Sequence, residues 1–490
     1  MADTIAAIST PQGEGGIGIV RISGDKSLDI MKKLLHPCPP VIRPRYAYYG
    51  NICRPESEEV VDEAICFYMK APHSYTCEDV VEIQAHGGVV SIRLILRAVL
   101  EAGARMAEPG EFTKLAFLNG RMDLEQAEAV IDVIKAKSEL PLQIAERQLR
   151  GRLGTEIRDI REQLRDVLAQ MTVNIDFPDE DIEQVENEKF LASLREIQAH
   201  IQRLLDTCDD GRIAKEGIKV AIAGKPNVGK SSLMNALLGE ERAIVTSIPG
   251  TTRDTIEESA NIGGIPLVLT DTAGIRDTED VIEKIGIRKS HEEMEAADLL
   301  ILVMDGSRKL EEAEEQELRE MIPSNWGIDR ETDEAEKAER NRENREYQGN
   351  HSRRTNERSK VLVVINKEDL GCCVTEEEVC RVLGNVKVVR TSLLTMEGAD
   401  TVAAAIREMF ASGIESMTER NIITSERHRN ALERGLLAAS DGISLLESGE
   451  AIEICEIPVH NAYDCLGEII GETAGEEILD TVFSKFCLGK

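Results

Sequence analysis

The sequence predicts a multidomain protein of the α/β and α classes. We expect an N-terminal α+β domain, a discontinuous helical bundle in two segments, and an α/β domain inserted between those segments. The prediction rests on hydrophobic spacing, which passes along the 490-residue chain from strand-like alternation to helical spacing, then to continuous apolar runs, and back to helical spacing. An insertion of this kind is tolerated because the termini of a domain often lie close together.

Composition excludes several classes of protein. The length of 490 residues fits roughly three domains of ~150 residues. A net charge of −32 opposes general binding to nucleic acids or anionic membranes, so any RNA contact would need a local basic patch or a partner's surface. The segment after Met1 is no secretory signal, and Leu299–Met304 is far shorter than the ~18 apolar residues of a membrane span. The 11 cysteines form no Cys-x-x-Cys pair, so we expect a soluble, cytoplasmic protein with no zinc site, no disulfide framework and no membrane contact.

Residues 1–118 are predicted to form the α+β domain, and residues 119–213 and 412–490 the helical domain. Alternating runs between glycine-rich turns indicate strands at Thr4–Ile8, Gly16–Ile22, Ala64–Met69 and Val80–Ala85, with a helix near Val90–Ala102. The helical domain shows two apolar stripes with a spacing of three or four residues. They are Leu153, Ile157, Ile160, Leu164, Val167, Met171 and Ile175, and then Leu194, Ile197, Ile201 and Leu204.

Residues 214–411 are predicted to form the inserted α/β domain. Nearly continuous apolar runs of strand length alternate with helical stretches there, as in a sheet buried on both faces. The runs are Ile218–Ala223, Ile265–Leu269, Leu299–Met304, Val361–Ile365 and Val386–Val389. A charged insertion at about 327–360 interrupts them, and we expect it to be solvated because it contains almost no large apolar residue.

A phosphate-binding loop is predicted after the first of these runs. Gly224–Ser232 fits the pattern G-x-x-x-x-G-K-[ST] between a strand and a helix, which is the context that this motif requires. Its glycines allow backbone N–H groups to surround phosphate oxygens, while Lys230 supplies positive charge and Ser231 a hydroxyl for Mg²⁺. The predicted contacts in this loop are Asn227, Val228, Gly229, Lys230, Ser231 and Ser232.

Three further motifs distinguish GTP from ATP. Asp271-Thr-Ala-Gly274 and Asn366-Lys-Glu-Asp369 each follow a strand-like run, and the Asp369 carboxylate can accept hydrogen bonds from the N1–H and 2-amino group of guanine. Gly250-Thr-Thr-Arg-Asp254 contains Thr252, the natural second Mg²⁺ ligand. In this order the motifs predict a Ras-like GTPase domain. The predicted contacts outside the phosphate loop are Thr246, Ser247, Ile248, Pro249, Gly250, Thr251, Thr252, Asp271, Thr272, Ala273, Gly274, Asn366, Lys367, Asp369 and Ser392.

The group that activates water is less evident. Ras-like GTPases place a Gln after Asp-x-x-Gly, but this chain has Ile275, which cannot orient a water molecule. Asn227 and residues 246–251 could instead coordinate a monovalent cation where an arginine finger would lie. Glu283 could reach the water through the switch loop, although its residue type alone favours an ordinary solvated acid.

Motifs outside the GTPase domain show a resemblance to one family. The chain resembles the MnmE (TrmE) tRNA modification GTPases over nearly its whole length. The motifs that carry this resemblance are Asp3-Thr-Ile-Ala-Ala, Gly16-Ile-Gly-Ile-Val-Arg-Ile-Ser-Gly24, Glu78-Asp-Val-Val-Glu-Ile-Gln-Ala-His-Gly-Gly88, Pro109-Gly-Glu-Phe-Thr113, Ala116-Phe-Leu-Asn-Gly-Arg121, Asp123-Leu-Glu-Gln-Ala-Glu-Ala129, Asp176-Phe-Pro-Asp-Glu180 and the terminal Phe486-Cys-Leu-Gly-Lys490.

The resemblance implies ligands and partners. It implies a homodimer joined through the N-terminal domains, with a tetrahydrofolate one-carbon derivative bound near Arg21, Glu82, Arg121 and Lys490. It also implies GTPase domains that pair across K⁺, held by Asn227, Thr246, Thr251 and the Ile248 carbonyl. Glu283 would fix the hydrolytic water through a second water, and Arg276 would belong to the switch region. With a flavoprotein of the MnmG type, as a heterotetramer, such a protein is expected to modify C5 of the wobble uridine of certain tRNAs with a carboxymethylaminomethyl-type group.

Some positions depart from the family pattern or stay open. Cys77 replaces a usual Gly and Leu115 a commonly basic residue. In the loop Thr391-Ser-Leu393, on the guanine side of the predicted site, Leu393 replaces the Ala of the usual Ser-Ala pair. Cys487 fits a nucleophilic thiol or a packing residue. Two other functions remain open at this stage: a GTPase of ribosome assembly, and a folate-dependent group-transfer enzyme with a vestigial nucleotide switch.

Overall fold

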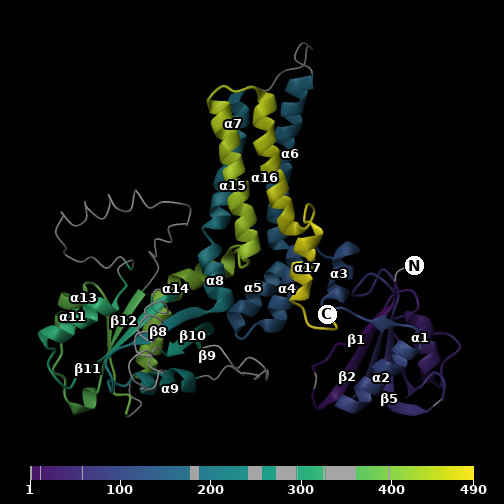
Figure 1. Ribbon diagram of the computed structural model, residues 1–490, viewed down its shortest axis with the longest axis horizontal. Helices are drawn as coiled ribbons and strands as arrows, with labels where there is room; N and C mark the ends of the chain where they lie inside the picture. Colours follow the sequence, from purple (N-terminus) through teal and green to yellow (C-terminus); the bar gives the residue numbers. More distant parts are fainter. Residues whose placement is uncertain are drawn as a thin grey trace, which may run out of the picture. The chain divides into compact units, whose positions relative to one another are not determined.

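The computed structural model describes residues 3–11, 13–57, 59–176, 187–240, 257–271, 294, 296–323, 326, 360–394 and 398–490. The chain divides into two compact units. The first unit consists of Met1–Lys135, Ala145–Asp206 and Glu426–Lys490, and the second of Ala136–Ile144 and Thr207–Ser425. The predicted fold class is confirmed: an N-terminal α+β part, a discontinuous helical part and an inserted α/β part follow one another along the chain (Figure 1). The predicted boundaries between three domains stay a prediction.

A seven-stranded sheet forms the N-terminal part of the first unit. Its order is β3-β4-β5-β6-β2-β1-β7, and its pairs are antiparallel except for β1 with β7. The strands are β1 (Ile5–Ile8), β2 (Gly15–Ser23), β3 (Leu35–His36), β4 (Ala47–Cys53), β5 (Val60–Met69), β6 (Val80–Gly87) and β7 (Arg105–Met106). All four predicted strands are present, whereas β3, β4 and β7 were not predicted.

Helices cover one face of this sheet. Helix α1 (Ser27–Leu34) and helix α2 (Val89–Glu101) pack their apolar residues against the strands in one core, while α3 (Glu111–Leu118) follows β7 (Figure 1). Side chains of the opposite face are more accessible, and Tyr49 and Ile65 on neighbouring strands are 68% and 40% exposed. The alternation that predicted strands therefore separates a covered face from an open one.

The helical part of the first unit is a bundle. It contains α4 (Leu124–Lys135), α6 (Arg152–Asp176), α7 (Asn187–Leu205), α15 (Glu426–Glu447), α16 (Ile452–Ile470) and α17 (Glu476–Ser484); α5 (Glu139–Leu149) spans the boundary between the units. The predicted stripe on α6 is buried from Leu153 to Met171, with Ile175 half-buried at the end of the helix. Helices α15 and α16 pack against α7 and α6, so segments distant in sequence form one core (Figure 1). No helix in the described part of the chain has the length and apolar character of a membrane span.

The second unit is a six-stranded sheet with helices on both faces. Its order is β13-β12-β11-β8-β10-β9, and only β9 runs antiparallel to its neighbour. The strands are β8 (Ile218–Ala223), β9 (Glu257–Ile262), β10 (Ile265–Asp271), β11 (Leu299–Asp305), β12 (Lys360–Asn366) and β13 (Lys387–Arg390). Helices α9 (Lys230–Glu240) and α14 (Ala399–Glu419) pack in one core with α8 (Cys208–Glu216), and α11 (Glu312–Met321) and α13 (Glu376–Leu383) in another.

This sheet agrees with the five predicted apolar runs. Strands β11 and β12 are buried on both faces, as their continuous apolar sequences require. The predicted insertion falls between α11 and β12; residues 327–359 lie outside the described residues, and Lys360 already belongs to β12. The carboxyl ends of the parallel strands bring the predicted nucleotide motifs to one edge.

Candidate nucleotide site and N-terminal pocket

The phosphate loop leaves β8 in the centre of the sheet and leads into α9. Gly224 and Gly229 have φ angles of +147° and +110°, which favour glycine. A Cβ atom on Gly224 would lie 2.2 Å from the Val303 carbonyl oxygen, and one on Gly229 would lie 2.2 Å from Nδ2 of Asn366. The phosphate loop therefore needs both glycines because β11 and the segment Asn366–Asp369, called here the guanine motif, lie so close to its backbone. Any contact with phosphate comes in addition.

The side chain of Lys230 is bonded to the backbone of its own loop. Its ammonium donates hydrogen bonds to the carbonyl oxygens of Gly224 at 2.7 Å and Lys225 at 2.9 Å. Ser231 and Ser232 lie exposed in the first turn of α9, where backbone N–H groups and the helix dipole favour an anion. The loop thus brings together an ammonium, two hydroxyls and the N-terminal turn of a helix, a set of groups that suits a phosphate chain.

Asn366 connects the two halves of the site. This residue is 4% exposed, and its Nδ2 donates to the carbonyl of Val228 in the phosphate loop at 2.8 Å. Its Oδ1 accepts the N–H of Leu393 at 3.1 Å, in the loop after β13. The replacement of Ala by Leu393 leaves this backbone group in place, because the side chain is buried in the core beneath the loop.

The carboxylate that is predicted to contact guanine, that of Asp369, is also positioned by a neighbour. Asp369 lies in the short 3-10 helix Glu368–Leu370, is exposed, and accepts a 2.6 Å hydrogen bond from the Ser392 hydroxyl. Lys367 has a φ angle of +68° and donates to Asp305 at 2.7 Å. Burial disfavours the charged form of Asp305, but bonds from Lys367 and Ser307 outweigh it and lower the pKa of Asp305 to about 2.

Several predicted groups are not covered by this description. Asp271 ends β10, in register with Ile222 at the end of β8, so its backbone lies beside the phosphate loop. Twelve predicted residues lie outside the described residues: Thr246, Ser247, Ile248, Pro249, Gly250, Thr251, Thr252, Thr272, Ala273, Gly274, Arg276 and Glu283. Their roles in Mg²⁺ binding, K⁺ binding and water activation stay predictions.

Sequence reasoning missed two carboxylates of this region. Asp305 could have been found, because it ends a predicted parallel strand at the same edge as the motifs. Glu314 carried no such signal, since it lies within an acidic helix and only the fold brings it to Lys225.

The first unit contains a separate group of predicted residues. Arg21 on β2 stands opposite Glu82 on β6, and its Nε and Nη2 donate to one carboxylate oxygen at 3.0 and 2.9 Å. The guanidinium lies 5.2 Å from the ring centroid of Tyr75 and 5.7 Å from that of Phe112. Its Nη1 is buried and has no hydrogen-bond partner among the residues that the structure describes. A buried donor in this state fits an acceptor on a bound molecule.

Arg121 reaches the same ring from another segment. Its guanidinium lies 4.8 Å from the Tyr75 centroid and donates to the Tyr75 carbonyl at 2.6 Å. An open cavity of about 760 Å³ adjoins these groups. Its lining includes Arg45, Phe67, Met69, Tyr75, Glu82 and Arg121. Cys77 also lines it, with a φ angle of +62°, a conformation that the family's usual Gly adopts without strain.

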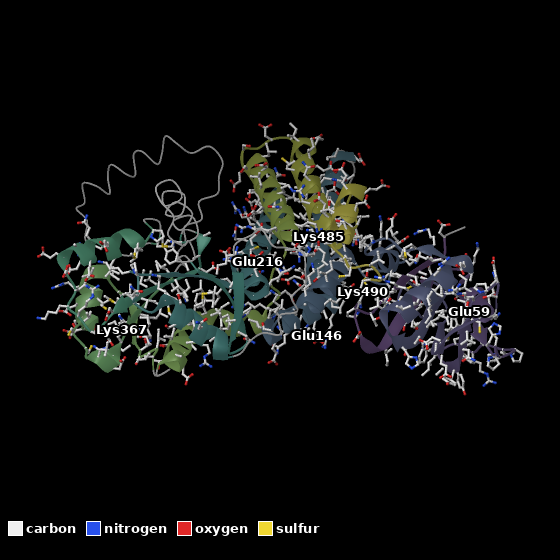
Figure 2. All side chains as sticks on the ribbon, turned by 60° about the horizontal axis from the view of Figure 1, so that its bottom comes forward. Glu59, Glu146, Glu216, Lys367, Lys485 and Lys490 are labelled. Atoms are coloured by element: carbon white, nitrogen blue, oxygen red, sulfur yellow. The ribbon has the colours of Figure 1, made fainter. Side chains whose placement is uncertain are left out.

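The C-terminal residues lie near Ser9 and near the pair Arg21 and Glu82. The Gly489 carbonyl accepts a hydrogen bond from the Ser9 hydroxyl at 3.2 Å, and Lys490 follows it at the end of the chain (Figure 2). Burial and the charge of Arg21 lower the pKa of the Lys490 ammonium, although Glu82 and Cys487 act in the opposite direction. The four residues that the resemblance assigned to a folate site, Arg21, Glu82, Arg121 and Lys490, thus lie around one region of the first unit.

Comparison with known proteins extends over the whole chain. Residues 124–487 match the family described as the MnmE helical domain, and residues 4–121 match the N-terminus of GTP-binding protein TrmE. The tRNA modification GTPase MnmE of Alkaliphilus metalliredigens (strain QYMF) is 44% identical over 492 residues, covering 100% of this chain and 99% of its own. The protein of the same name from Clostridioides difficile (strain 630) is 43% identical with the same coverage. A solved G domain of T. maritima FeoB, 27% identical, covers 39% of this chain and 98% of its own with a TM-score of 0.25.

Proposed function

Because this chain belongs to the MnmE family of tRNA modification GTPases, we propose that it binds GTP and hydrolyses it to GDP and phosphate. The observation that carries this proposal is the pair of bonds made by the buried Asn366 amide, to the Val228 carbonyl and from the Leu393 N–H. One side chain holds the phosphate loop, the guanine motif and the loop after β13 together. A nucleotide that spans both halves of the site requires this arrangement.

Lys230 and Asp369 would hold the two ends of the nucleotide. The Lys230 ammonium, bonded here to two carbonyls of its own loop, would exchange them for oxygens of the β- and γ-phosphates. Asp369 would accept the N1–H and 2-amino protons of guanine while Ser392 keeps the carboxylate in place. Adenine has no donors in this pattern, so the same carboxylate would exclude ATP.

We propose two cations at the phosphate end. Ser231 and Thr252 would hold Mg²⁺ near Asp271, and Asn227, Thr246, Thr251 and the Ile248 carbonyl would hold K⁺. The cations would supply positive charge for the leaving phosphate, which an arginine finger supplies in other GTPases. Glu283 would orient the attacking water, and Arg276 would belong to the switch region. Asn227 supports this assignment, because its exposed side chain projects from the phosphate loop at a φ angle of +63°.

GTP turnover measured in KCl and in NaCl at equal ionic strength tests the K⁺ assignment. We expect faster turnover in KCl, with Glu283→Ala slow in both salts and nearly unchanged in GDP affinity. Equal rates in the two salts would remove K⁺ from the mechanism, and unchanged turnover of Glu283→Ala would remove that residue from it.

The N-terminal pocket supports a folate site. A pterin ring offers carbonyl and ring-nitrogen acceptors for the spare Nη1 of Arg21, and amino donors for Glu82. The aromatic ring of Tyr75 and the volume of about 760 Å³ suit a flat ligand of this size. Tetrahydrofolate would carry the one-carbon unit, while Arg121 and Lys490 provide cationic groups for its glutamate carboxylates.

We further propose that two copies of the chain and a flavoprotein of the MnmG type act together on tRNA. The open face of the N-terminal sheet, with Tyr49 and Ile65 exposed, supports a homodimer through this part. GTP hydrolysis would drive conformational change during installation of a carboxymethylaminomethyl-type group at C5 of the wobble uridine. The net charge of −32 favours the partner as the main source of tRNA attraction.

A reconstituted reaction tests this function. The chain, an MnmG-type flavoprotein, unmodified tRNA, GTP and methylene-tetrahydrofolate are combined, and the nucleosides are identified by mass spectrometry. We expect a modified uridine that disappears with Lys230→Ala or without folate. A product that persists with Lys230→Ala would favour a vestigial nucleotide switch. Ribosome co-sedimentation without any dependence on folate would favour ribosome assembly.

A further inference from the structure

We propose that Glu314 of α11 is a positioning residue for the nucleotide, which holds the phosphate loop in its binding conformation through Lys225. Neither residue belongs to the groups that we expect to touch phosphate or guanine. The proposal therefore extends the nucleotide site to a helix on one face of the sheet, outside all of its sequence motifs.

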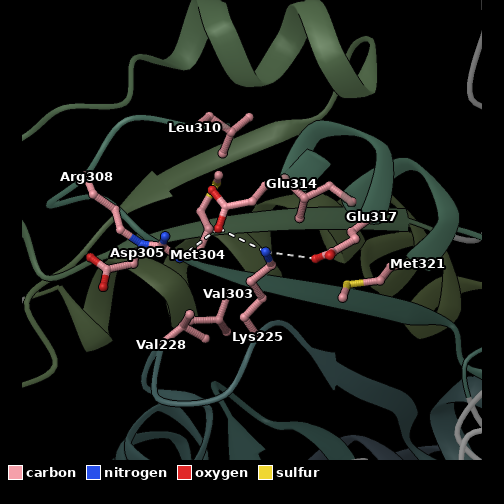
Figure 3. Close-up of a pocket in the computed structure, with 11 residues that line it drawn as sticks. Lys225, Val228, Val303, Met304, Asp305, Arg308, Leu310, Glu314, Glu317 and Met321 are labelled. Carbon is pink, nitrogen blue, oxygen red and sulfur yellow. Dashed lines mark hydrogen bonds and ion pairs between the residues drawn. The ribbon is translucent and has the colours of Figure 1, made fainter. Parts of the chain in front are cut away.

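Lys225 is the link between this helix and the loop. Its ammonium lies 3.0 Å from Oε1 of Glu314 and 2.9 Å from Oε2 of Glu317, and Figure 3 shows the nitrogen between these two carboxylates. Its backbone carbonyl accepts the 2.9 Å hydrogen bond from the ammonium of Lys230. The residue that holds Lys230 from one side is thus itself held by α11 from the other.

Glu314 is a buried carboxylate that is held by several bonds. It is 7% exposed, its Oε1 also lies 2.7 Å from Nη2 of Arg308, and its Oε2 accepts the N–H of Glu311 at the start of α11. Burial disfavours its charged form, but the bonds from Lys225 and Glu311 and the charges of Lys225 and Arg308 outweigh it, so the pKa of Glu314 lies below its ordinary value. A buried carboxylate with two cationic partners resists displacement, because moving it away would separate it from both cations.

Apolar packing between the phosphate loop and α11 is incomplete beside these ion pairs. Between the loop and α11 lies a small cavity of about 30 Å³ with a mainly apolar wall, which includes Val228, Val303, Leu310, Leu318 and Met321 (Figure 3). Side chains that face a cavity lose dispersion contacts on that side. The ion pairs of Lys225 therefore provide the direct connection between the phosphate loop and the helix at this point.

The same segment also reaches the guanine half. Asp305 ends β11 and binds Lys367 of the guanine motif at 2.7 Å, and Arg308 follows it by three residues and binds Glu314. Residues 305–314 thus connect both halves of the nucleotide site on the side of α11. A change at Glu314 is expected to affect how tightly nucleotide is held, without changing which base is read.

Release of a fluorescent GDP, measured by stopped flow on the full chain, tests the proposal without requiring hydrolysis. Glu314→Gln keeps the shape of the side chain and removes its charge, and we expect release to become about three- to tenfold faster. Glu315→Gln is the matched control, because Glu315 lies on the same helix and faces Arg381 of α13 at 3.0 Å. This control should release GDP at the rate of the unmodified chain.

A double substitution shows whether Glu314 acts through Lys225. Lys225→Met alone should speed release by a similar factor, and Glu314→Gln added to it should change the rate less than about twofold. An undiminished effect in the Lys225→Met background, or unchanged release in Glu314→Gln, overturns the proposal. Should Glu314→Gln lower the thermal midpoint strongly, Lys225→Met decides alone, and normal release by that variant overturns the proposal equally.

Discussion

The nucleotide site and the N-terminal pocket are assembled in different ways. The first gathers contiguous motifs that follow β8, β10 and β12, and parallel strands bring their carboxyl ends to one edge of a sheet. The second gathers single side chains from Arg21, Glu82, Arg121 and Lys490, which an antiparallel register and the C-terminal residues bring together. A site of the first kind can be recognised from its motifs alone. A site of the second kind has no local signal, and only the family resemblance pointed to it.

The largest expected effect is a change of base specificity in the motif-built site. Asp369→Asn replaces two charge-assisted acceptors by an amide, so GTP should bind at least about 100-fold more weakly. Xanthosine triphosphate should bind better than GTP, because its 2-oxo group accepts a hydrogen bond from the new amide. Competition against a fluorescent GDP measures both affinities.

Glu368→Gln provides the control for that substitution. Glu368 lies beside Asp369 in the same short helix and its side chain is exposed, so its loss should leave GTP affinity unchanged. Retention of full GTP preference by Asp369→Asn would contradict the assignment of Asp369 to the base.

The fold could be predicted best where burial was most complete. Strands β11 and β12 are buried on both faces, so their continuous apolar runs could not be mistaken. Strand β9 was not predicted because its sequence, Glu257–Ile262, is largely polar, and in the sheet as described it is an edge strand paired with β10. Strand β4 was not predicted because Gly50 and Asn51 interrupt the alternation of apolar residues. Gly50 is needed there because His36 in the adjacent strand lies too close for a side chain.

The motifs of the nucleotide site could likewise be predicted from the sequence, and their contacts with a nucleotide stay a prediction. The sequence identified the groups expected to touch nucleotide, because phosphate and guanine demand particular residue types at fixed spacing. It did not identify Glu314, because an ion pair between distant segments leaves no pattern along the chain, whereas Asp305 could have been found from its place at the end of a predicted strand. Residues such as Glu314, which support the motifs through contacts between distant segments, are recognised only in the folded chain.

A smaller effect is expected in the pocket built from single side chains. Arg21→Met retains an apolar stem near Tyr75 but removes the half-buried guanidinium, including the buried Nη1 that has no hydrogen-bond partner in the described part of the chain. We expect tetrahydrofolate affinity to fall about 10- to 100-fold, because a hydrogen bond to a charged group is lost inside a partly buried site. Isothermal titration with a stable folate derivative measures this loss.

The same variant tests the contrast between the two sites. Its GTP affinity should stay unchanged, since Arg21 belongs to the first unit and the nucleotide motifs to the second. Arg97→Met removes an exposed arginine from α2 of the same domain and should leave both ligands unaffected. Equal folate binding by Arg21→Met and Arg97→Met would contradict the proposed folate site.

The smallest expected effect concerns pH and also distinguishes the units. Glu125 in the first unit is 1% exposed, and burial and the charge of Asp123 raise its pKa from 4.5 to about 9. Below pH 4.5 the folded and unfolded chains both hold this proton; above it the unfolded chain releases the proton first. The stabilisation is therefore complete below 4.5 and is lost as pH rises through about 9.

Glu125→Gln is neutral at every pH and should remove this dependence. At pH 5 the variant should unfold near the temperature of the parent chain, and at pH 9 it should unfold at a higher temperature, by about 2–4 °C for each kcal/mol recovered. The relevant transition is the one that added GDP does not shift, because ligand binding stabilises only the unit that contains its site. Glu146→Gln, an exposed carboxylate of the first unit, should show no such gain. A gain of the same size at both pH values would show that the titration of Glu125 does not cause the effect, and would contradict its raised pKa.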